Sequence, residues 1–112
     1  VIMYHYKATL NRIIDGDTID VNIDLGFDVK IKQRVRLYGI NTPEVRTRDL
    51  VEKEKGIKAT EYLKTILPKE FIIKTILNKR GKYGRVLGIL LVNDENINEK
   101  MVNEGYATRY NT

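Results

Sequence analysis

Alternating hydrophobic and polar positions predict that most of this chain forms β-strands. In residues 18–25 every second side chain is aliphatic. Because side chains alternate between the two faces of a strand, we expect the aliphatic set to face a core and the residues between them to face solvent. The inward set is Ile19, Val21, Ile23 and Leu25. Runs rich in β-branched and aromatic residues predict further strands at residues 4–14, 29–40, 70–77 and 86–93.

Two segments have helical character instead. Residues 54–67 carry an apolar stripe with the period of a helix, and the residues before them, 45–53, are charged, have no period and are predicted to form a surface loop. The stripe consists of Ala59, Leu63, Ile66 and Leu67. Asn98 is a good N-cap for a second, short helix, which we expect to end at Glu104, with Gly105 as the residue that terminates it.

The order of these elements indicates a fold. Three strands, a helix, two strands and a short C-terminal helix follow one another, which is the order of a five-stranded Greek-key barrel of the OB type. We therefore predict a mainly β protein with helices (α+β), an OB-fold barrel with a helix between strands 3 and 4. The 112 residues suffice for one hydrophobic core, so residues 1–112 are predicted to form a single domain. A fold by itself does not determine function.

Composition says more about which partners the protein can bind than about its fold. With 20 Lys and Arg against 15 Asp and Glu, the net charge of +5 favours a polyanionic partner, although the same charge also promotes solubility. The absence of Cys excludes disulfides, thiol nucleophiles and Cys-ligated zinc. No signal peptide and no membrane-spanning run is visible, so we expect no membrane partner and leave the compartment open: cytoplasmic, or secreted if a presequence was removed. We also expect a monomer.

Polar residues that suit phosphodiester chemistry cluster at the ends of predicted strands. The clusters are residues 15–18, 41–44 and 82–85. Asp15 and Asp17 flank a glycine, an arrangement common in turns, but carboxylates at a strand end can also bind Ca²⁺. Glu44 is either a solvated loop acid or, beside a metal and a phosphate, a base that accepts a proton from an attacking water.

Cationic and aromatic residues complete the set. Arg36 and Arg85 can form bidentate contacts to a phosphate and offset the charge that builds up when it becomes five-coordinate, and neither is expected in the core. Lys82 offers a phosphate contact, and Tyr83 offers a face on which a base can stack. Each of these residue types is also common on ordinary protein surfaces. The interpretation as a phosphodiester site therefore rests on their combination.

The three clusters together resemble a known family. Asp15-Gly-Asp-Thr18, Arg36-x-x-x-x-Asn-Thr-Pro-Glu44 and Lys82-Tyr-Gly-Arg85 resemble the motifs of the staphylococcal nuclease (thermonuclease) family, in the same order. The resemblance extends over nearly the whole chain. It implies a Ca²⁺-dependent, sugar-nonspecific endonuclease that cleaves the phosphodiester bonds of DNA and RNA and leaves 3′-phosphate ends. Its nucleic-acid partners would be single-stranded or denatured DNA, and RNA.

The resemblance also implies a role for each matching residue. The ligands of a single Ca²⁺ would be Asp17, Asn41 and the backbone carbonyl of Thr42. The catalytic residues would be Arg36 and Arg85, which bind phosphate, and Glu44, the proposed general base. Lys82 and Tyr83 would contact the terminal phosphate of the nucleotide. Asp15 would lie next to the metal ligands without itself binding the ion.

The sequence departs from the family pattern at three points. Asn41 stands where the family has a second aspartate ligand, so one negative charge is lost and Ca²⁺ affinity is expected to fall. Gly81 replaces an acid, and Tyr110 lies near the position of the base-stacking tyrosine but out of register. Asn41 favours one alternative, a non-catalytic nucleic-acid-binding OB-fold module; a protein-interaction domain is another. The retained Arg36, Glu44 and Arg85 favour the enzyme.

Overall fold

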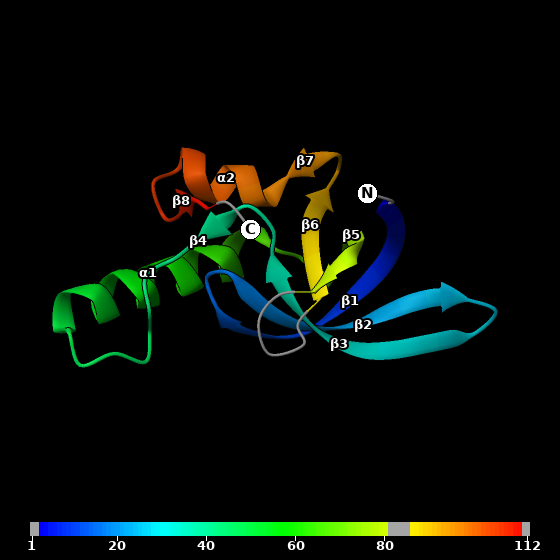
Figure 1. Ribbon diagram of the computed structural model, residues 1–112, viewed down its shortest axis with the longest axis horizontal. Helices are drawn as coiled ribbons and strands as arrows, with labels where there is room; N and C mark the ends of the chain where they lie inside the picture. Colours follow the sequence, from blue (N-terminus) through cyan, green and yellow to red (C-terminus); the bar gives the residue numbers. More distant parts are fainter. Residues whose placement is uncertain (1–2, 81–85, 111–112) are drawn as a thin grey trace.

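A closed barrel forms the centre of the computed structural model, which describes residues 3–80 and 86–110 (Figure 1). Its strands are β1 (Met3–Asp15), β2 (Thr18–Gly26), β3 (Val29–Leu37), β5 (Glu70–Arg80) and β6 (Val86–Val92). They pair antiparallel in the order β3-β2-β1-β5-β6, and parallel pairing of β3 with β6 closes the barrel. The predicted five-stranded OB-type barrel is therefore confirmed.

The remaining elements lie at one end of this barrel. They are β4 (Ile40–Asn41), α1 (Leu50–Ile66), β7 (Glu95–Asn96), α2 (Ile97–Asn103) and β8 (Thr108–Arg109). β4 pairs with β8, and β7 adds to the edge of β6. Figure 1 shows both helices on the side opposite the projecting β2–β3 hairpin. Among the described residues, no helix is both long and apolar enough to cross a membrane.

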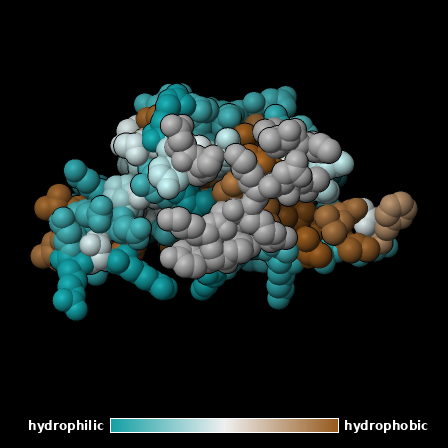
Figure 2. All heavy atoms as spheres, in the orientation of Figure 1, coloured by the Kyte–Doolittle hydropathy of each residue, from teal (hydrophilic) through white to brown (hydrophobic). Residues whose placement is uncertain are grey.

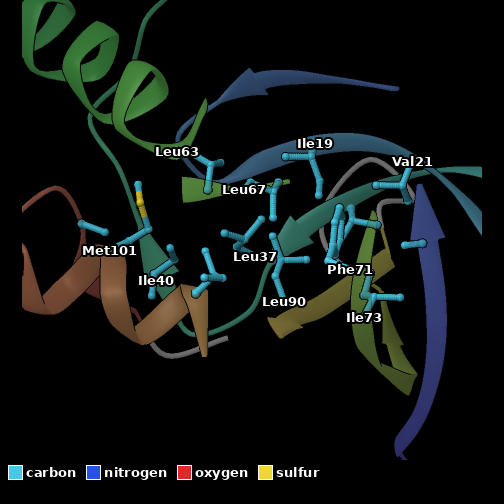
Figure 3. Packing of buried hydrophobic residues seen from close by; sticks show 14 of the residues in the cluster. Ile19, Val21, Leu37, Ile40, Leu63, Leu67, Phe71, Ile73, Leu90 and Met101 are labelled. Carbon is cyan, nitrogen blue, oxygen red and sulfur yellow. The ribbon is translucent and has the colours of Figure 1, made fainter. Parts of the chain in front are cut away.

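The barrel interior and the inner faces of the helices share one hydrophobic core (Figure 3). Ile19, Leu37 and Leu90 of the strands meet Leu63 of α1 and Met101 of α2. All five side chains have no exposed surface. Each such burial contributes about 1.5–3 kcal/mol of hydrophobic stabilisation, so the helices are held on the barrel by the same core that holds the strands together.

The β2–β3 hairpin extends beyond this core. Ile19, Val21 and Ile23 are buried as predicted, but Leu25 is 40% exposed. The expectation that Leu25 faces the core is wrong because the barrel is closed only from Val35 onward, where β3 pairs with β6. Nearer the tip of the hairpin, the inward face of the sheet has no opposing strand among the described residues.

Helix α1 begins earlier than its apolar stripe predicts. It starts at Leu50 rather than at residue 54, within the segment predicted to be a loop. Asp49 is the N-cap, and its Oδ1 accepts the backbone N–H groups of Val51 at 3.0 Å and Glu52 at 3.3 Å. The first turn exposes Leu50 and Val51, so it has no inward-facing stripe, and the cap determines where the helix begins.

Helix α2 is capped by a different asparagine from the one predicted. The side chain of Asn96 accepts a backbone N–H of the first turn at 3.0 Å, so Asn96 is the N-cap. Asn98 is instead buried within the helix, where its Oδ1 accepts the N–H of Leu90 at 3.1 Å. Its Nδ2 donates to the carbonyls of Tyr38 at 2.9 Å and Gly88 at 3.0 Å. The prediction that Asn98 is the N-cap is wrong because its side chain forms hydrogen bonds with three backbone groups outside α2.

Candidate active site

The candidate site forms where β3 ends and the chain turns toward α1. The strand predicted to continue to residue 40 ends at Leu37. Gly39 has a φ of +81°, a left-handed conformation that glycine adopts without steric cost, and β4 then begins at Ile40. This turn brings residues 41–44 beside the turn between β1 and β2, as the contacts of Asp17 show.

Asp17 joins these two turns. Its Oδ2 accepts the backbone N–H of Thr42 at 3.0 Å, and its Oδ1 accepts the hydroxyl of Thr18 at 3.1 Å. The Asp17 N–H donates to Oδ1 of Asp15 at 3.2 Å, and the Asp17 carbonyl accepts the N–H of Leu37 at 2.8 Å. The carboxylate of Asp17 is therefore fixed in position by its own turn and by the Thr42 segment.

Arg36 is buried beside Asp17, with only 8% of its surface exposed. Its Nη1 donates to the carbonyls of Leu37 at 2.9 Å and Ile40 at 2.8 Å. Its Nη2 donates to Oδ1 of Asn41 at 3.2 Å and lies 3.5 Å from Oδ2 of Asp17. The expectation that Arg36 lies outside the core is wrong, because the turn after β3 wraps two carbonyls around the guanidinium.

The two acids of the β1–β2 turn differ in their affinity for a proton. Burial raises the pKa of Asp15 to about 7, and hydrogen bonding to Asp17 and the charge of Asp17 add to this effect. Burial would also raise the pKa of Asp17. The hydrogen bond from Asp15, the charge of Arg36 and the N–H of Thr42 outweigh it and lower the pKa of Asp17 below its usual value. Asp17 is thus the acid that ionises first.

Two glycines allow α1 to approach the site closely. A Cβ on Gly56 of α1 would lie 2.7 Å from the carbonyl oxygens of both Pro43 and Glu44. A Cβ on Gly16 would lie 2.9 Å from the Cβ of Ala59. Both distances are shorter than van der Waals contact. The isolated glycine inside the predicted helix was a signal of close packing that the sequence analysis did not use.

Glu44 lines a surface depression of about 380 Å³ between β4, α1 and the segment after α2. Its side chain is exposed, whereas Thr42 is buried. Asn41, Thr42 and Pro43 line the same depression, together with Lys55 of α1. The depression therefore places Glu44 in reach of solvent beside the residues that surround Asp17.

The residues present can hold a hard cation. Asp17, Asn41 and the Thr42 carbonyl offer a carboxylate, an amide oxygen and a carbonyl, all ligands of the type that Ca²⁺ prefers. The buried Thr42 Oγ1 has no hydrogen-bond partner within the described part of the chain, so this pocket has unused polar capacity. This ligand set holds one ionised acid, Asp17, which lies beside Arg36. Among the residues that the structure describes, no group of three His, Cys, Asp or Glu residues is placed to hold a metal ion. The fit is one of ligand type, with little negative charge.

The structure brings together six of the nine predicted site residues. They are Asp15, Asp17, Arg36, Asn41, Thr42 and Glu44. Lys82, Tyr83 and Arg85, with the substituted Gly81, lie outside the described residues. Tyr110, which is out of register in the sequence, lies with its ring 5.8 Å from the Arg36 guanidinium carbon. Its N–H donates to the Gly39 carbonyl at 2.8 Å, so the pairing of β4 with β8 brings it there.

Comparison with known proteins identifies the family of this site. The family model described as staphylococcal nuclease homologue matches residues 34–112. The chain belongs to the staphylococcal nuclease family. The match includes Arg36, Asn41, Thr42 and Glu44, and it covers well over half of the chain, so the expected family membership is confirmed.

Several known proteins are similar to this chain along most of its length. The thermonuclease of Staphylococcus intermedius is 34% identical over 99 residues, which cover 88% of this chain and 56% of that protein. Endonuclease YhcR of Bacillus subtilis is 30% identical over 113 residues, 94% of this chain and 9% of YhcR. Protein MJ1439 of Methanocaldococcus jannaschii is 30% identical over 131 residues, 95% of this chain and 60% of MJ1439. The chain thus spans only part of the length of these relatives.

Proposed function

We propose that this staphylococcal nuclease homologue is an endonuclease that hydrolyses phosphodiester bonds of DNA and RNA, depends on Ca²⁺ and leaves 3′-phosphate ends. The observation that carries the proposal is the buried Arg36 guanidinium, fixed between the oxygens of Asp17 and Asn41. Glu44, three positions after Asn41 on the same segment, is exposed to solvent. Relatives that are named thermonuclease and endonuclease support nuclease chemistry.

Arg36 would stabilise the charge that develops on the phosphate. Its Nη1 donates to the carbonyls of Leu37 and Ile40 and its Nη2 donates to Oδ1 of Asn41, so Nε and the second hydrogen of Nη2 are the donors that we assign to a phosphate oxygen. Because these contacts already hold the guanidinium in place, little reorganisation is needed when the transition state forms. Arg85, outside the described residues, remains the predicted second donor, and Lys82 and Tyr83 remain predicted nucleotide contacts.

Glu44 would act on the attacking water. Its position on the depression beside Asn41 and Thr42 allows solvent to reach it without unfolding of the site. The carboxylate would accept a proton as the water oxygen attacks phosphorus and the 5′ oxygen leaves, which is general-base catalysis. The close contact of Gly56 with the Pro43 and Glu44 carbonyls would keep this carboxylate in its place.

Asp17, Asn41 and the Thr42 carbonyl would hold the Ca²⁺. When bound, the ion supplies positive charge that polarises phosphate oxygens and orients the substrate. The second carboxylate that the family pattern has at position 41 is absent here, so we propose weaker Ca²⁺ binding than in a two-aspartate site. Asp15 holds the Asp17 turn through its contact with the Asp17 N–H.

Incubation with denatured DNA and with RNA, in Ca²⁺ or in chelator, tests the proposal. We expect cleavage of both polymers in Ca²⁺ only, with products that carry 3′-phosphates and become substrates for a 3′-phosphatase. Glu44→Gln should slow cleavage by about 10²–10⁴-fold, because only the proton acceptor is removed. Glu54→Gln, which changes an exposed acid on α1, should cleave at the unmodified rate.

The alternative function gives a different result. A non-catalytic nucleic-acid-binding module would bind the same polymers and leave them intact in Ca²⁺ and in chelator. Asn41 is the residue that favours this alternative, because it removes one anionic ligand. Cleavage that is unaffected by Glu44→Gln would refute the assigned base, and binding with no cleavage under any metal would refute the enzyme.

A further inference from the structure

A row of cations on β3 is not used by the proposed chemistry. Lys30, Lys32 and Arg34 occupy alternate positions of this strand, and all three are exposed. Because side chains alternate in direction, they lie on the same face of β3 as Arg36. Neighbours on that face are about 7 Å apart along the strand, a length comparable to that of one extended nucleotide. The row therefore leads directly to the guanidinium of the candidate active site.

A broad depression lies beside this row. Its volume is about 760 Å³, about twice that of the depression at Glu44. Lys32 and Arg34 line it, together with polar side chains from β1 and β2. Among these, Asn11 Nδ2 donates to Oδ1 of Asn22 at 3.1 Å. The lining residues include no aromatic ring, so this surface offers charge and hydrogen bonds rather than stacking.

An acid on β2 orients Arg34 of this row and Arg12 of β1. Asp20 Oδ1 accepts Nε of Arg34 at 2.8 Å, and Oδ2 accepts Nη2 of Arg34 at 3.1 Å. Nε of Arg12 also donates to Oδ2 of Asp20, at 3.2 Å. Nη1 of Arg34 and the terminal nitrogens of Arg12 have no partner in these contacts, so they can donate to a bound anion. Asp20 thus positions the arginines.

Positive charge remains in excess on this face of the sheet. The cross-strand register places Asp24 between Lys7 of β1 and Lys30 of β3. With Asp20 there are two acids on this face of β1, β2 and β3, away from the candidate active site, against five cations. The cations are Lys7, Arg12, Lys30, Lys32 and Arg34. This excess is complementary to a polyanion.

A second copy of the chain does not suit this surface. From Val29 to Arg34, β3 is paired only with β2 in the part of the chain that the structure describes, so its other edge is open. Antiparallel pairing of two such edges places Lys30 of one copy opposite a cation of the other, for example Lys32. Like charges directly opposite one another destabilise a strand pair, and edge lysines commonly prevent such pairing.

The other face of the hairpin is apolar. Leu25, Val29 and Ile31, with Phe27 at the tip, are exposed large hydrophobic residues. Figure 2 shows hydrophobic residues gathered over the hairpin, with hydrophilic side chains protruding from its lower edge. Such a two-faced hairpin is also compatible with an anionic membrane. The continuity of the cationic row with Arg36 favours a nucleic acid instead.

We propose that Lys30, Lys32 and Arg34 form a track that binds the phosphate backbone of a nucleic-acid strand leading away from the active site. The inference rests on the proposed function, since the strand in the track is the substrate of that site. The track extends the binding surface by several nucleotides. It binds through phosphate contacts, which carry no base preference. Longer strands should therefore bind better than short ones, whatever their sequence.

Binding in chelator to labelled oligothymidylates of about 4 and about 16 nucleotides tests the track without cleavage. The double variant Lys30→Gln, Lys32→Gln is compared with Lys58→Gln, Lys64→Gln, which removes two exposed lysines from α1. Two lost phosphate contacts should weaken binding of the long strand by at least about tenfold near 0.1 M salt. They should also make its log–log salt slope shallower by about 1.4. Binding of the short strand, and binding by the α1 variant, should match the unmodified protein.

The outcomes separate the track from the enzyme. If the unmodified protein cleaves nothing in Ca²⁺ but the length-dependent binding is lost in the β3 variant, the track stands and the proposed function fails. If cleavage is normal and both double variants bind the long strand like the unmodified protein, the track is wrong. Binding to phosphatidylserine vesicles that is lost in the β3 variant, with oligonucleotide binding unchanged, would also overturn the track. Melting curves confirm that each variant is folded.

Discussion

The carboxylate of Asp17 accepts the backbone N–H of Thr42 at 3.0 Å, across 25 positions of sequence. This bond joins the turn after β1 to the segment that carries Glu44. It also places one carboxylate oxygen of Asp17 near both Thr42 and Nη2 of Arg36. The proposed metal ligands and the phosphate-binding arginine are therefore parts of a single hydrogen-bonded unit, and a change in one member should affect the others.

Replacing Arg36 with Ala should reduce both activity and stability. Loss of one preorganised donor to the transition state costs about a hundredfold or more in rate. Because the carbonyls of Leu37 and Ile40 lose their shared donor in a buried place, the free energy of unfolding should also fall by about 1–3 kcal/mol. Cleavage of denatured DNA and urea unfolding measure the two effects. Arg48→Ala, at an exposed arginine, should unfold like the unmodified protein, and a folded Arg36→Ala that cleaves normally would refute the assignment.

Replacing Asn41 with Asp should strengthen Ca²⁺ binding. The new carboxylate would add negative charge to the proposed ligand set, and calorimetric titration measures the affinity. In chelator we expect little change in melting temperature, because Nη2 of Arg36 lies 3.2 Å from Oδ1 of Asn41 and 3.5 Å from Asp17 and would offset the repulsion between the two acids. Asn103→Asp, which adds the same charge at an exposed position of α2, should leave Ca²⁺ affinity unchanged. Equal affinities in all three proteins would mean that Asn41 is not a ligand.

Replacing Gly56 with Ala should destabilise the protein, although alanine is the better helix former by about 1 kcal/mol. The added Cβ would meet two backbone carbonyls at 2.7 Å, so α1 or the Pro43–Glu44 segment must move. We expect a loss of about 1–3 kcal/mol in stability, as for overpacked cores, and slower cleavage because Glu44 is displaced. Chemical denaturation and cleavage rates test both effects. Lys58→Ala, nearby on the exposed face of α1, is the control, and a more stable Gly56→Ala protein would contradict the packing.

Replacing Asn98 with Ala should cost about 3 kcal/mol of unfolding free energy, because buried backbone groups of Leu90, Tyr38 and Gly88 each lose a partner. Asn103→Ala, at an exposed asparagine of the same helix, should cost less than about 1 kcal/mol. Urea denaturation of both variants provides the comparison. Similar losses in the two would show that the Asn98 contacts contribute little to the attachment of α2.

Local pattern was a sufficient guide to the barrel but not to the ends of its helices. Alternation places Ile19, Val21 and Ile23 inside, because the direction of a side chain on a strand depends only on its neighbours in sequence. The start of α1 was not predicted for two reasons. Asp49 lies in a charged segment without hydrophobic periodicity, and the helical turn that it caps exposes its apolar residues to solvent. Leu25 was misplaced because alternation gives the face of a residue and not how far the opposing strand extends.

The sequence by itself determined which chemical groups are present at the site and in what order, since Asp17, Arg36, Asn41 and Glu44 are recognisable from residue type and spacing. Only the tertiary structure decided how deeply these groups are buried and how readily the acids bind a proton. Arg36 is buried because the turn at Gly39 places the Ile40 carbonyl against it, and the pKa of Asp15 rises because its turn is packed against α1 and Thr42 and is removed from water. Asn98 ties α2 to the Tyr38 carbonyl across 60 positions. Each of these effects depends on burial by residues far away in sequence, which no local pattern can specify.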